Sequence, residues 1–101
     1  MTLKQLNSLP IGSKTDVYFG NTECLLTVHD VGLDIPEKYF MIVIFNTDCS
    51  PRENEYWLKI TGTRFRFQAW IGGESCLEEM QSKSYPLRDL KFLEEYIAYK
   101  N

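Results

Sequence analysis

The segment that most constrains the fold is residues 39–47, with the sequence YFMIVIFNT. Its apolar side chains occupy both alternating sets of strand positions, whereas a strand with one face in water carries them mainly on one set. Such a strand is expected at the centre of a sheet, with cover on both faces. The segment therefore predicts one of two architectures. Either the sheet curls into a partial barrel, or another element or another chain covers its second face.

Local signals predict a helix and two strands in the first third of the chain. Thr2 and Gln5 have the spacing of a capping box, which predicts a short helix over residues 3–8. Residues 15–19 and 22–29 are rich in β-forming side chains, and a Gly-Asn pair separates them. Because such a pair favours a two-residue hairpin, we expect these segments to be antiparallel neighbours.

Residues 56–71, with the sequence YWLKITGTRFRFQAWI, are expected to be extended. Gly62 interrupts them and is either a hairpin turn or a bulge in one long strand, since glycine occurs at both. We predict the hairpin. In either case Arg64, Arg66 and Trp70 share one face of the sheet, because side chains alternate along a strand.

Two helices are predicted at the end of the chain. Ser75 and Glu78 form a second capping-box match, which predicts a short helix ending near Ser82. Pro86 suits the first turn of a terminal helix that runs to Tyr99.

Composition and element order together predict the fold class. The chain has 101 residues, of which 44% are hydrophobic and 25% charged, as expected for one globular domain over residues 1–101. The expected class is α+β. It comprises an antiparallel meander of about five strands, open or curled into a partial barrel, with a short N-terminal helix and two C-terminal helices.

Charge and cysteine content narrow the function classes. The net charge of −3 has the wrong sign for a general DNA-binding protein and disfavours a membrane-surface role. The three cysteines, Cys24, Cys49 and Cys76, form no Cys-x-x-Cys motif, and the chain has one histidine. We therefore expect no zinc site and no cofactor. With no signal-peptide pattern and no membrane span, we expect a cytoplasmic protein with reduced thiols.

Basic and aromatic side chains alternate in one part of the sequence only. The candidate contact residues are Trp57, Lys59, Arg64, Arg66 and Trp70. Tryptophan and arginine are frequent hot spots of protein interfaces. The same residue types suit single-stranded nucleic acid, whose phosphates and bases they contact. A third interpretation pairs the arginines with Glu53 or Glu55, which would make this an ordinary polar face.

The expected terminal helix carries a wide apolar arc. Its aliphatic stripe comprises Leu90, Leu93 and Ile97. Its aromatic edge comprises Phe92, Tyr96 and Tyr99. A helix packed on a sheet needs less apolar width than this. We therefore expect the aromatic edge to contact a loop or to mediate self-association into a homodimer.

Catalytic groups are sparse. His29 and Asp30 are adjacent and would point to opposite faces of a strand. A thiol- or histidine-dependent enzyme would need His29 to meet a cysteine, Ser13 or Ser75 across the fold. Cys76 is the best-placed thiol, in the expected first turn of a helix, but acidic residues surround it. We therefore predict that the chain is not an enzyme.

The sequence predicts a small non-catalytic protein-binding module. Domains of this kind are common among inhibitors, immunity proteins and phage or mobile-element accessory proteins, a comparison of class and not of residues. The expected partner is another protein. The first alternative is a single-stranded nucleic-acid-binding domain that uses residues 56–71, and the second is a thiol- or histidine-dependent enzyme.

Overall fold

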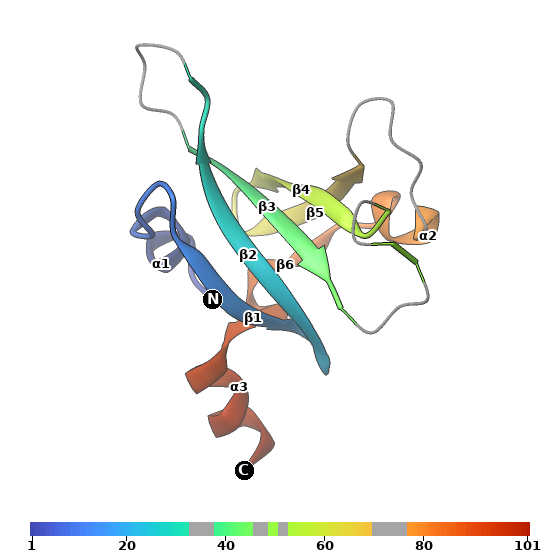
Figure 1. Cartoon of the computed structure of the whole chain (residues 1–101). Helices are drawn as coiled ribbons and strands as arrows, with labels where there is room; N and C mark the ends of the chain where they lie inside the picture. Colours follow the sequence, from blue (N-terminus) through green and yellow to red (C-terminus); the bar gives the residue numbers. More distant parts are fainter. Residues whose placement is uncertain (33–37, 46–48, 51–52, 70–76) are drawn as a thin grey trace.

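The computed structural model describes residues 1–32, 38–45, 49–50, 53–69 and 77–101. Its main element is one sheet of seven strands in the order β6-β5-β4-β3-β2-β1-β7, and every neighbouring pair is antiparallel (Figure 1). The strands are β1 (Lys14–Phe19), β2 (Thr22–Asp30), β3 (Lys38–Ile44), β4 (Glu55–Thr61), β5 (Arg64–Ala69), β6 (Tyr85–Pro86) and β7 (Leu90–Phe92). The helices are α1 (Leu3–Asn7), α2 (Glu78–Gln81) and α3 (Leu93–Lys100).

The two edge strands of this sheet are consecutive in the chain. β6 pairs with β5 at one edge and β7 pairs with β1 at the other, and only the 3-10 turn η1 (Leu87–Asp89) separates them. One short segment therefore spans both edges and curls the sheet into a nearly closed barrel. The predicted α+β class is confirmed, and so is the curled form of the sheet, although it has seven strands where about five were expected.

The prediction of a terminal helix from Pro86 is wrong. Pro86 has φ −70° and ψ 145°, which is extended backbone, and α3 begins only at Leu93. Leu87 and Leu90, on either side of the turn, are 3% and 0% exposed. Burial of both leucines and strand pairing at both sheet edges thus outweigh the local preference for a helix start. Proline tolerates this position because it lies in an edge strand.

The capping box at Thr2 and the two hairpins form as predicted. The Thr2 hydroxyl accepts a hydrogen bond from the Gln5 amide at 3.1 Å, and the Gln5 side chain accepts one from the Thr2 amide at 2.8 Å. Both predicted hairpins form, with Gly20 at φ +61° and Gly62 at φ +62°. This left-handed conformation favours glycine at both turns. Helix α2 begins after Leu77, and the capping residue predicted at position 75 lies outside the described residues.

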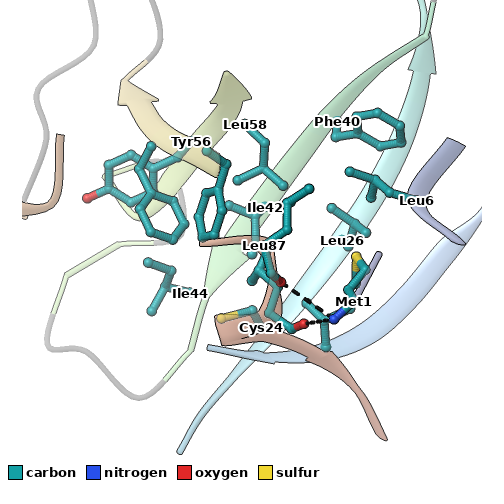
Figure 2. Packing of buried hydrophobic residues seen from close by; sticks show 14 of the residues in the cluster. Met1, Leu6, Cys24, Leu26, Phe40, Ile42, Ile44, Tyr56, Leu58 and Leu87 are labelled. Carbon is teal, nitrogen blue, oxygen red and sulfur yellow. Dashed lines mark hydrogen bonds between the residues drawn. The ribbon is translucent and has the colours of Figure 1, made fainter. Parts of the chain in front are cut away.

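The hydrophobic core fills the inside of the curled sheet (Figure 2). The inward side chains of β3 are Phe40, Ile42 and Ile44, which are at most 5% exposed. Leu6 of α1 joins them and is fully buried. The Met1 amino group donates hydrogen bonds to the carbonyl oxygens of Leu90 at 2.7 Å and Leu87 at 3.5 Å, which joins the first residue to the closing segment (Figure 2).

Leu90→Ala should destabilise the protein strongly, because this side chain is fully buried in β7. We expect the free energy of unfolding to fall by about 2–5 kcal/mol, the cost of lost burial plus a cavity. Denaturation in guanidinium chloride measures it. Leu93→Ala is the matched control, since Leu93 is 44% exposed on α3 and should cost far less. Equal losses in the two variants would contradict the closing role of β7.

Candidate functional site

A row of four side chains crosses the outer face of β2 to β5. Thr27, Met41, Trp57 and Gln68 lie side by side across these four strands. Met41 is 1% exposed although it alternates along β3 with the core residues. The strand that is apolar on both faces therefore has its inner face in the core, while on its outer face Met41 is buried and Tyr39 and Val43 stay partly exposed.

Three rings on this face stack on one another. We call this stack the aromatic row, and it comprises His29, Tyr39 and Trp57. The His29 and Tyr39 centroids are 5.1 Å apart with planes at 15°, and those of Tyr39 and Trp57 are 5.2 Å apart at 20°. His29 Nε2 also lies 2.8 Å from the Thr27 hydroxyl. Because β3 lies between β2 and β4, the two partners use both faces of the Tyr39 ring. The three rings are thus held in place by their contacts with one another, and they remain partly exposed to solvent.

Three cations lie beside the aromatic row on the same face. Lys59 is directly opposite Arg66, and Arg64 is opposite Thr61. Like charges that face each other across a strand pair reduce stability. Within the described part of the chain, neither Lys59 nor Arg66 has a hydrogen-bond or ion-pair partner. The sheet therefore keeps an unfavourable charge pair in a protein whose net charge is −3.

Arg64 differs from its two cationic neighbours because its guanidinium is held in place. Its Nε donates to the Ser84 hydroxyl at 2.9 Å, and its Nη2 donates to the Ser84 carbonyl at 2.8 Å. Ser84 directly precedes β6, so this contact joins the β4–β5 hairpin to the closing segment. A guanidinium has five N–H donors, and these two bonds leave others available.

The ion pairs proposed for the arginines with Glu53 or Glu55 do not form. The Glu53 carboxylate instead accepts hydrogen bonds from the amide and hydroxyl of Ser50, at 2.9 and 3.0 Å. These two bonds hold the pKa of Glu53 below its usual range. The cations therefore remain uncompensated by these two carboxylates, and the interpretation as an ordinary charge-paired face loses its basis.

The structure thus unites four of the five predicted contact residues. The hairpin at Gly62 brings Trp57, Lys59, Arg64 and Arg66 to one face, while Trp70 lies outside the described residues. Sequence reasoning missed Tyr39, His29 and Ser84. The alternation in β3 was a signal for Tyr39, but its stacking partners are set by strand register. No local pattern indicates the contact between Arg64 and Ser84.

The aromatic edge of α3 packs mainly against the sheet. The Tyr96 ring stacks on Tyr18 of β1 with centroids 3.9 Å apart, and Tyr96 is only 7% exposed. Phe92, which was predicted on this edge, belongs to β7 and is half-buried against the core, whereas Tyr99 is 72% exposed. Self-association through this edge stays a prediction. In the monomer, Tyr99 is the residue of the predicted edge that is exposed.

The aliphatic side chains of α3 are exposed instead of packing on the sheet. Leu93 is 44% exposed and Ile97 is 49% exposed, although the sequence suggested this stripe for packing on the sheet. Leu90 belongs to β7 and is fully buried. The helix is therefore turned so that the large aromatic Tyr96 gains the buried position, since a ring stack offers more contact area there.

The groups proposed for catalysis do not come together in the described residues. His29 points outward from β2, whereas Cys24 lies on its inner face and is fully buried. The Ser13 hydroxyl donates to the carbonyl of Pro10 at 2.6 Å. Cys49 is disulfide-bonded, so the expectation of reduced thiols is wrong for this residue. Positions 75 and 76 lie outside the described residues.

Cys24 should make stability depend on alkaline pH. Burial raises the pKa of its thiol from the ordinary 9.0 to about 12. Below 9.0 both the folded and the unfolded chain keep the proton. Between these two values the unfolded chain releases it first, so the free energy of unfolding falls as pH rises, by at most about 1.4 kcal/mol per pH unit.

The slope of unfolding free energy against pH, compared between wild type and Cys24→Ala, isolates this contribution from lysine and tyrosine titration. The variant should be less stable near neutral pH and have a shallower alkaline fall. Parallel slopes in the two proteins would contradict the assignment.

Arg66→Gln should stabilise the free protein slightly, because it removes one of two directly opposed cations. We expect a gain of a few tenths of a kilocalorie per mole in low salt. The gain should vanish at high ionic strength, where charges are screened over a few ångströms. Arg88→Gln on the exposed 3-10 turn is the control and should give no such gain. Salt-independent destabilisation by Arg66→Gln would refute this account.

Comparison of the chain with family models, curated proteins and solved structures found no match. None of the helices in the described ranges is long and apolar enough to cross a membrane. Within the same ranges, no three histidine, cysteine, aspartate or glutamate side chains are grouped to hold a metal ion. The geometry of the outer face is therefore the basis for the function proposed below.

Proposed function

We propose that this chain is a non-catalytic protein-binding module that contacts its partner through the outer face of β2 to β5. The observation that carries the proposal is the aromatic row, His29, Tyr39 and Trp57, beside three cations. Large rings held in place lose little conformational entropy on binding, and such anchors contribute much of the affinity of protein interfaces.

The placement of the helices supports the choice of this face. Of the described helices, α3 packs on β1 and β7, and α2 packs on β5. Tyr39 and Trp57 on β3 and β4, the strands between β1 and β5, stay half-exposed. A partner that covered the row would bury aromatic surface next to guanidinium groups, the combination that is enriched in interface hot spots.

A protein partner fits the row better than single-stranded nucleic acid does. Nucleic-acid platforms present open ring faces on which bases stack. Here both faces of the Tyr39 ring are occupied by His29 and Trp57. The net charge of −3 also disfavours long-range attraction of a polyanion. Nucleic-acid binding is therefore the second candidate, supported by the three cations alone.

The proposed biological form is an inhibitor, immunity or accessory protein, which acts by occupying a surface of another protein. This step rests on the class of small non-catalytic modules and not on particular residues. Cytoplasmic location stays a prediction from the sequence. The disulfide at Cys49 weighs against it, because cytosolic thiols are mostly kept reduced.

Tyr39→Ala should weaken partner capture from nuclease-treated host lysate by about tenfold or more, the effect of losing an interface anchor. Tyr99→Ala is the matched control, since Tyr99 is the exposed tyrosine of α3, far from the row in sequence and on another element. Circular dichroism checks that both variants fold. Equal capture by the two variants would refute the proposal. Capture that occurs in untreated lysate and is lost after nuclease treatment would favour nucleic-acid binding.

A further inference from the structure

A hollow of about 460 Å³ lies at the hairpin end of the proposed contact face. It is bounded by the outward side chains of β4 and β5 on one side and by the end of α2 and the residue before β6 on the other. We call it the cationic pocket. Its described polar lining residues are Lys59, Thr61, Arg64, Arg66, Gln68, Gln81 and Ser84.

The pocket has an excess of positive charge. Lys59, Arg64 and Arg66 all line it, and its described lining contains no aspartate or glutamate. A surface that is merely solvated normally mixes both signs of charge, and this chain has more acidic than basic residues overall. Three cations without a carboxylate among the described lining residues are thus a local departure from the composition of the chain.

The strand pairing fixes the backbone positions of these residues before any ligand arrives, and the guanidinium of Arg64 is itself held in place. The ladder between β4 and β5 holds Lys59 opposite Arg66, at a cost in stability. The two hydrogen bonds to Ser84 hold the guanidinium of Arg64. A ligand that binds here pays less to order Arg64, and it relieves the repulsion between Lys59 and Arg66. Both effects favour an anion.

We propose that the cationic pocket binds an acidic peptide segment of the partner, with carboxylates at alternating positions. Arg64 and Arg66 are two residues apart on one face of β5, a separation of about 6.8 Å. The side chains of an extended peptide repeat at the same distance on one face. Planar guanidinium groups match carboxylates in bidentate geometry, and the amides of Gln68 and Gln81 supply neutral donors.

This assignment rests on the proposed function, because the segment belongs to the protein that covers the aromatic row. The number of cations in the pocket supports a segment and not a lone carboxylate, since a single carboxylate would leave two of the three cations without a counter-charge. The aromatic row and the cationic pocket then contribute differently to partner binding. The rings provide apolar burial, and the pocket selects partners by charge.

Fluorescence anisotropy with a labelled peptide of alternating glutamate and serine tests the assignment. The matched probes are a glutamine-serine peptide of equal length and an oligothymidylate with as many phosphates as the peptide has carboxylates. We expect the acidic peptide to bind in low salt, and to bind more weakly as salt is added. The glutamine peptide and the oligothymidylate should bind at least about tenfold more weakly.

Lys59→Gln with Arg66→Gln should weaken acidic-peptide binding by about tenfold or more. The control, Lys4→Gln with Arg88→Gln, removes the same charge from exposed positions on α1 and the 3-10 turn and should change binding less than about twofold. The first pair is expected to be slightly stabilising, so lost binding would not arise from unfolding. Equal losses in both pairs, or tighter binding of either comparison probe, would overturn the assignment.

The outcome separates this assignment from the broader proposal. If partner capture depends on Tyr39 while the acidic peptide does not bind, the protein-binding function stands and the pocket assignment fails. If capture is insensitive to Tyr39, the broader proposal fails whatever the peptide does.

Discussion

The fold depends on the closure of its sheet by residues 85–92. Within this segment β6 pairs with β5 and β7 pairs with β1, so a single short stretch supplies hydrogen-bond partners to both edges. Unpaired edges are the weak point of an open sheet. Leu87 and Leu90 point into the core from either end of the turn between these strands, which couples closure to apolar burial.

Closure also decides what the outer face can do. Once the sheet curls, the inner positions are committed to packing, and the outward positions of β2 to β5 form the face that we propose contacts a partner. The opposed Lys59 and Arg66 reduce stability there, and the aromatic row stays half-exposed beside them. Local departures from the most stable arrangement are expected where a surface has been kept for binding.

Local sequence signals were reliable where the local structure depends only on residues close by in the chain. The capping box of Thr2 and the glycine turn at Gly62 formed as predicted, because each depends on neighbours in the chain. The same reasoning failed at Pro86, whose helix-start signal is equally compatible with an edge strand. What decided that segment was pairing with β1 and β5, strands that are distant in sequence.

The sequence by itself determined the α+β class, the two hairpins and the need to cover both faces of β3, since these follow from local periodicity and turn chemistry. It also named the three cations of the candidate site and one ring of the aromatic row, Trp57. Only the tertiary structure decided that Tyr39 stacks between His29 and Trp57 and that Ser84 holds Arg64. These contacts arise from strand register and from sheet closure, and both depend on which distant segments pair.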